Sequence, residues 1–145
     1  MSAIIRSIIE DKLSAYLAAN LSGVTVHKGI TEELRVVPLV IAYCEAAMPD
    51  PALGATPLGN YRCKINVFVY SSADDDTLAT HRQRVSNVHG LMSDVNALKG
   101  LWNPNGSEGK MYACWIESDE EGMKSRNYGN HINYTMVAVL PPAPV

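Results

Sequence analysis

The chain has 145 residues, of which 47% are hydrophobic and 19% charged, with a formal net charge of −3 and a pI near 5.7. This length and composition fit one globular domain over residues 1–145 with a substantial core, and they argue against an intrinsically disordered chain. A mildly acidic chain has no general attraction for phosphate backbones or anionic lipid. We therefore expect neither sequence-specific nucleic-acid binding nor membrane association.

No segment of the sequence is suited to export or to crossing a membrane. The apolar start is interrupted by Arg6 and Glu10, so it lacks the continuous apolar core of a signal peptide. The longest apolar run, residues 36–44, is far shorter than the ~20 residues that a membrane helix needs, and it contains Pro38. We therefore expect a soluble protein that is made inside the cell.

The first expected element is a helix that begins near Ser2 and closes at about Asn20, because isoleucines and leucines recur there at three- and four-residue spacing. Its apolar positions spread over about 220° of the helical circumference, wider than the ~100° stripe that one buried face needs. Two explanations remain open: a helix buried deeply within one chain, or a second face that packs against another subunit. On the second explanation the candidate subunit-interface residues are Ile4, Ile9, Leu13 and Leu17.

Three stretches rich in β-branched and aromatic residues follow, and they predict strands over residues 24–28, 37–47 and 61–70. The third stretch alternates clearly, as a strand with one buried face does. Four of its residues are expected to point into the core: Cys63, Ile65, Val67 and Val69.

The longest expected helix begins after Asp74, Asp75 and Asp76 and runs to about Lys99. Its apolar residues step by three and four positions, as one buried stripe requires. The acidic cluster has two interpretations: a Mg²⁺ or Ca²⁺ site, or a helix start at which carboxylates stabilise the free N–H groups. We favour the helix start, because no calcium-loop spacing follows and the helix begins at that point.

Two further strands, residues 111–117 and 132–140, complete the order α-β-β-β-α-β-β. This order predicts an α+β fold with a mostly antiparallel sheet, flanked by an N-terminal helix and one long crossover helix. The long helix and the 61–70 strand have matching lengths of about 35 and 33 Å, so the helix should return the chain along the whole strand. The 111–117 strand should then run in the same direction as the 61–70 strand.

Two connections, residues 48–60 and 119–130, are much longer than the roughly two to five residues that hairpins prefer. Long surface loops commonly carry binding residues, and these two would leave opposite ends of the sheet. We therefore hypothesise that each loop contacts a different partner. The candidate contact residues are Met48, Asp50, Leu53, Leu58, Asn60, Glu120, Glu121, Met123, Lys124 and Arg126.

The sequence holds no motif that indicates catalysis, a cofactor or a metal ion. No two of the four histidines are three or four positions apart, and Cys44, Cys63 and Cys114 form no Cys-x-x-Cys pair. The serine-nucleophile, phosphate-loop and dinucleotide-binding patterns are missing as well. We therefore expect no enzyme, no catalytic residue, no metal and no cofactor, with the three thiols reduced and buried.

The middle of the chain resembles bacteriophage tail terminator proteins, which are small α+β subunits of the tail-completion type. The resemblance lies in the strand of residues 65–70, the acidic loop after it, and a helix that contains Leu78, Val85 and Leu91. The C-terminal strand, residues 131–135, and the helix-then-strand opening also fit. The likeness therefore spans most of the chain, as an order of elements and not as an invariant signature.

The resemblance implies one tail-terminator-like domain over residues 1–145 that assembles into a homo-oligomeric ring, commonly a hexamer. Such a ring sits on the tail tube at the tail–head junction of the virion, after assembly in the host cytoplasm. It would contact the tail tube protein, end tube polymerisation, and offer a surface to the head-completion (neck) protein. Two alternatives remain: another phage neck or baseplate connector, or a cytosolic enzyme or ligand-binding domain with an unrecognised site.

Overall fold

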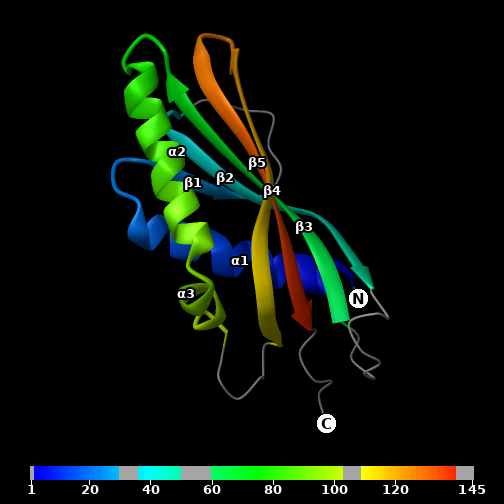
Figure 1. The fold of residues 1–145 in the computed structure, drawn as a ribbon. Coiled ribbons are helices and arrows are strands. Elements are labelled where there is room, and N and C mark those ends of the chain that lie inside the picture. Colours follow the sequence, from blue (N-terminus) through cyan, green and yellow to red (C-terminus); the bar gives the residue numbers. More distant parts are fainter. Residues whose placement is uncertain (1, 30–35, 50–59, 103–108, 140–145) are drawn as a thin grey trace.

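The computed structural model describes residues 2–29, 36–49, 60–102 and 109–139, except for the side chains of residues 2–4. A five-stranded sheet in the order β1-β2-β3-β5-β4 carries helices on one face (Figure 1). The elements in chain order are α1 (Ser2–Asn20), β1 (Thr25–Lys28), β2 (Leu39–Pro49), β3 (Asn60–Ser72), α2 (Leu78–Ser93), α3 (Val95–Lys99), β4 (Lys110–Lys124) and β5 (Asn127–Val139).

The predicted α+β fold is confirmed. β1 and β2 pair in parallel, whereas β2 with β3, β3 with β5, and β5 with β4 pair antiparallel, so the sheet is mixed but mostly antiparallel. β5 lies between β3 and β4 and runs opposite to both. β3 and β4 therefore run in the same direction, as expected for strands joined by a long helix that returns along the sheet.

The core lies between the sheet and the helices. The four alternating residues of β3 predicted to face it are all fully buried, which confirms the predicted face of that strand. Ile9, Leu13 and Leu17 of α1 are at most 1% exposed and belong to the same apolar cluster. Burial of each such aliphatic side chain contributes about 1.5–3 kcal/mol, so this packing is a main source of stability for α1.

The single long helix expected up to Lys99 is interrupted, and its start differs in detail. α2 ends at Ser93, because the Asp94 side chain accepts a hydrogen bond from the Ala97 N–H and so caps a separate short helix, α3. The N-cap of α2 is Thr77, whose side chain accepts from the Thr80 N–H. The aspartate cluster thus precedes the helix without capping it.

The prediction of a long loop over residues 119–130 is wrong. β4 and β5 continue through this region as a regular antiparallel hairpin, in which Lys124 pairs with Asn127 across a two-residue turn. Ser125 and Arg126 form the turn, and both have positive φ, 51° and 62°. Asp, Glu and Gly are poor strand formers individually, but cross-strand pairing outweighs that weak preference here.

Among the described residues, no helix is both long enough and apolar enough to cross a lipid bilayer.

Candidate functional site

A chain of hydrogen bonds joins α2 to one end of the sheet. His81 of α2 is fully buried, with Nδ1 2.8 Å from Ser71 Oγ of β3 and Nε2 2.6 Å from Asn130 Oδ1 of β5. Since an amide oxygen can only accept, Nε2 carries the hydrogen, and Nδ1 accepts from the Ser71 hydroxyl. Asn130 then donates through Nδ2 to Asp119 Oδ1 of β4 at 2.7 Å.

Charged groups terminate this network at both ends. At one end Arg84 donates to Ser71 Oγ at 3.0 Å and to Asp76 Oδ2 at 2.8 Å. At the other end Asp119 Oδ2 lies 3.1 Å from Nε2 of His89, a second histidine of α2. The polar network therefore holds α2 against β3, β4 and β5 together.

The Ser71–His81 pair has the atoms of a nucleophile and a base, but it is closed to substrates. Both residues are 0% exposed, and Ser71 Oγ is also occupied by Arg84. A buried polar group without a partner costs about 1–3 kcal/mol, so a fully paired network favours one position of α2 on the sheet. Sequence reasoning missed this cluster because His81 is 10 positions from Ser71 and 49 from Asn130.

The sheet face opposite the helices is uncovered by any described helix, and it contains two hollows. The first, about 270 Å³, lies where Gly122 and Gly129 face each other across β4 and β5, and Phe68 and Tyr70 border it. The second, about 310 Å³, lies further along the same face beside Asn133, whose buried Oδ1 has no hydrogen-bond partner. Hollows of this size can receive single side chains of a partner.

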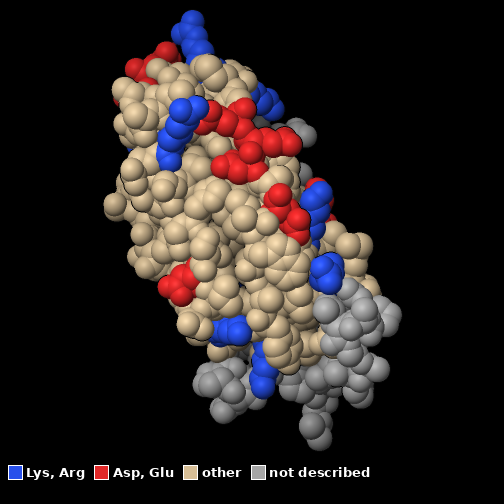
Figure 2. All heavy atoms as spheres, in the orientation of Figure 1, with Lys and Arg blue, Asp and Glu red and all other residues tan. Residues whose placement is uncertain are grey.

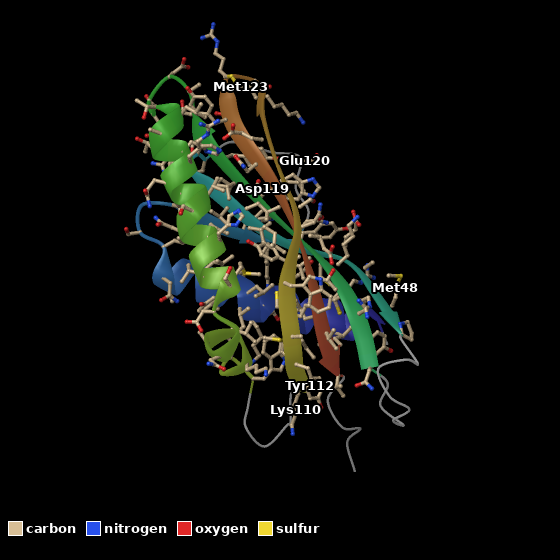
Figure 3. The ribbon with its side chains drawn as sticks, in the orientation of Figure 1. Met48, Lys110, Tyr112, Asp119, Glu120 and Met123 are labelled. Atoms are coloured by element: carbon tan, nitrogen blue, oxygen red, sulfur yellow. The ribbon has the colours of Figure 1, made fainter. Side chains whose placement is uncertain are left out.

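β4 forms one outer edge of the sheet and gathers exposed acidic and apolar side chains. Figure 2 shows the acidic side chains over the middle of this edge, where Figure 3 labels Asp119 and Glu120. Glu121 accepts two hydrogen bonds from Arg82 of α2, at 3.0 and 2.8 Å, and these lower the pKa of Glu121 below its usual value. Trp115 is still 39% exposed, so this edge combines charge with accessible apolar surface.

The sequence-predicted contact residues of the second connection lie on this hairpin and not on a loop. Glu120, Glu121, Met123 and Lys124 belong to β4, and Arg126 belongs to the turn. Met123 is 64% exposed near the tip (Figure 3). These five residues thus lie along the hairpin half of β4 and in the turn that follows it, on a paired strand and not on a loop.

The residues predicted in the first connection are only partly described. Met48 lies near the end of β2 and is 55% exposed, whereas Asn60 begins β3 and is buried. Asp50, Leu53 and Leu58 lie outside the described residues. The Met48 end of the sheet is opposite to the hairpin tip, so the expectation that the two connections leave opposite ends is confirmed (Figure 3).

The proposed subunit-interface residues of α1 are in a different position from the one expected. Ile9, Leu13 and Leu17 are buried in the core of the same chain, so a neighbouring subunit cannot reach them without opening that core. The side chain of Ile4 is outside the described part. The wide apolar surface of α1 therefore corresponds to the other explanation, a helix buried deeply in one chain.

The three cysteines are free and buried, as predicted. Burial raises the pKa of Cys114 to about 12, so its thiol stays protonated and unreactive at neutral pH. A hydrogen bond with Cys63 and burial raise the pKa of Cys44 as well. Within the described ranges, no group of three or more His, Cys, Asp or Glu side chains is arranged to hold a metal ion.

Comparison with known proteins gives a match of fold only. No protein-family model and no curated protein sequence matches the chain. A chain in the virion of a native gene transfer agent particle is similar in structure, with a TM-score of 0.59 and 12% sequence identity over 93% of this chain and 94% of that one. A second solved protein, without a descriptive name, is 16% identical over 99% of this chain and 97% of that one; its TM-score of 0.48 carries no argument.

Proposed function

We propose that the chain is a structural component of a phage-like virion, and more narrowly a tail terminator that forms a homo-oligomeric ring, commonly a hexamer, at the tail–head junction. The observation that carries this proposal is the shared fold with a virion protein over nearly the whole of both chains. The sequence resemblance to phage tail terminators supports the same role and rests on different observations.

The exposed surfaces of the sheet are also consistent with an assembly protein. One face carries two hollows instead of a helix layer, and the 15-residue β4 leaves one side of its backbone without a strand partner among the described residues. Exposed strand edges and apolar patches are typical of surfaces that contact other chains. The role is mechanical, since complementary surfaces end tube growth without any bond chemistry.

The two ends of the sheet are candidates for two different partners. In this proposal one end, either the Met48 end or the tip around Met123, contacts the tail tube protein. The other end contacts the head-completion (neck) protein or a neighbouring copy. The ring would assemble in the host cytoplasm and remain in the virion.

Native mass spectrometry and electron microscopy of the protein with purified tail tubes test this function. We expect a closed oligomer, visible as a cap at one end of each tube, and tubes that no longer grow when tube protein is added. Replacing residues 123–128 by Asn-Gly, which keeps the pairing of Gly122 with Gly129, and separately shortening 50–59, should each abolish binding to one partner only. A protein that stays monomeric both alone and with tubes would contradict the proposal.

A further inference from the structure

The two outer edges of the sheet are β1 and β4, which run in opposite directions. The strand registers align His27 of β1 with Glu120 of β4. We infer that β4 of one copy pairs antiparallel with β1 of the next copy, and that this contact repeats head to tail around a ring. The inference rests on the proposed ring and names the surfaces that would join its subunits.

Both edges have one side free to accept a strand. Within the described part of the chain, β4 pairs with β5 alone and β1 with β2 alone. Unpaired edges promote uncontrolled association, and proteins usually protect them. A head-to-tail contact between β4 and β1 uses both edges of every copy, so that no edge remains open once the ring closes.

The direction of the strands permits this contact. β1 runs parallel to β2, and each of the three remaining pairings in the sheet reverses direction, so β1 and β4 run in opposite directions. Adjacent strands of a sheet twist relative to one another, so a neighbouring copy must be turned to bring its β1 alongside β4. A neighbour that continues the sheet with the same face outward would place its β1 antiparallel to β4.

The register also places the two edges at the same level. Followed across the sheet, His27 of β1 aligns with Ile41, then Phe68, then His131, and finally Glu120 of β4. A contact that continues these registers unchanged would place the short β1 of one copy against the segment of β4 around Glu120 in its neighbour, and not against the ends of that strand.

The aligned segments carry one complementary pair of side chains. Along the same registers, His27 and Glu120 align on the uncovered side of the sheet, and within the described residues neither has a partner in its own chain. Lys28 and Asp119 align on the helix side, but Lys28 binds Asp11, and Asp119 binds Asn130 and His89, within the same chain. An exposed carboxylate that faces an imidazole able to donate a hydrogen bond favours this pairing and this register.

Cysteine cross-linking tests the contact directly. The register aligns Thr25 of β1 with Gly122 of β4, and a Cβ at Gly122 meets no atom within 4 Å, so T25C and G122C should both fold. The native cysteines are buried and should not interfere. With a short bis-maleimide, we expect the double variant to give a ladder of multiples up to the ring, and each single variant to stay uncross-linked.

The outcomes separate this contact from the proposed function. Native mass spectrometry of the wild type, alone and with tail tubes, reports the ring independently of the cysteines. If the wild type forms a ring but the double variant gives no cross-linked ladder, the β4–β1 contact is wrong and the proposed ring is unaffected. Dimers of G122C alone would indicate symmetric β4–β4 pairing and would also overturn the β4–β1 contact. A wild type that never assembles overturns both.

A charge variant gives a second measurement. Glu120→Lys replaces the carboxylate opposite His27 by a cation, so the protein concentration at half-assembly should rise about tenfold, as for a loss of about 1.4 kcal/mol. Asp75→Lys is the matched control, because it makes the same change of charge at an exposed position that belongs to neither β1 nor β4. Equal assembly of the two variants would contradict the proposed register.

Discussion

Nε2 of His81 and Oδ1 of Asn130 lie 2.6 Å apart in the core, although 49 positions separate the two residues in the sequence. The contact joins α2 to β5, the strand that also separates β3 from β4. A single buried histidine therefore links the helix layer to the centre of the sheet.

His81→Leu should destabilise the protein, because it leaves Ser71 and Asn130 buried with unpaired polar atoms. We expect a loss of about 1–3 kcal/mol for each group that stays unsatisfied, seen as a lower urea midpoint. His89→Leu is the control, since its side chain is 31% exposed at the surface end of the network and water can replace it. An equal loss of stability in both variants would show that the buried hydrogen bonds of His81 contribute no more than the exposed contact of His89.

Arg84→Met should cost more stability than Arg82→Met, although both arginines lie on α2 and both bind a carboxylate. The side chains of Arg84 and Asp76 are 22% and 19% exposed, whereas that of Arg82 is 62% exposed. Removing Arg84 leaves a half-buried carboxylate and one hydrogen bond of Ser71 unpaired, a loss of about 1–3 kcal/mol. For the exposed pair of Arg82 with Glu121, water and salt screen most of the interaction. Urea denaturation of the two variants measures the difference in stability, and high salt should leave this difference unchanged or widen it; a difference that disappears in high salt would contradict the prediction.

The protein should lose stability in alkali. The pKa of Cys114 is raised from 9.0 to about 12 by burial, so the folded state holds a proton that the unfolded chain releases. Stabilisation of this kind is complete below pH 9 and is lost as the pH rises from 9 towards 12. Burial also raises the pKa of Tyr134, so this residue adds to the loss of stability in alkali. The urea midpoint should therefore fall as the pH rises above 9. In Cys114→Ala the midpoint should fall less steeply with pH; an equally steep fall would show that ionisation of Cys114 is not the cause.

The double variant S125N/R126G should stabilise the β4–β5 hairpin. Both turn residues have positive φ, a conformation that costs an ordinary side chain about 1–2 kcal/mol and that Asn and Gly adopt readily. We expect a gain of about 1 kcal/mol in the free energy of unfolding, measured by urea denaturation. The control S125V/R126V should lose stability, because β-branched residues fit this conformation poorly. A gain in the valine variant would mean that the turn is not held in this geometry.

Much of the sheet could be predicted because its signals are local. The alternation of Cys63, Ile65, Val67 and Val69 alone identifies the buried face of β3, and the spacing of apolar residues identifies both long helices. The hairpin cannot be read from the sequence because its segment is polar and loop-like in composition, and its turn residues, Ser125 and Arg126, are not the Asn-Gly pair that usually marks such a turn.

The candidate contact residues on the β4–β5 hairpin could be predicted only in part, because local sequence signals do not show the structure that supports them. The length of an expected loop points to Glu120 and Arg126, and both side chains are exposed, Glu120 within β4 and Arg126 in the turn that follows it. Their support is instead a paired strand and a tight turn whose two central residues, Ser125 and Arg126, are neither glycine nor asparagine. The alignment of β1 with Glu120 depends on the registers of four strand pairs. A sequence pattern cannot predict those registers.

The place of β5 in the sheet has a consequence for the order of folding. β4 and β5 join across a two-residue turn, so this hairpin closes with little loss of chain entropy. Docking it onto β3 is slower, because that step brings together residues such as Asn66 and His131, which are 65 positions apart. Until then the chain consists of two half-sheets, each with an apolar face and an open edge. Docking of β5 onto β3 should therefore limit the folding rate, and aggregation should compete mainly at that step.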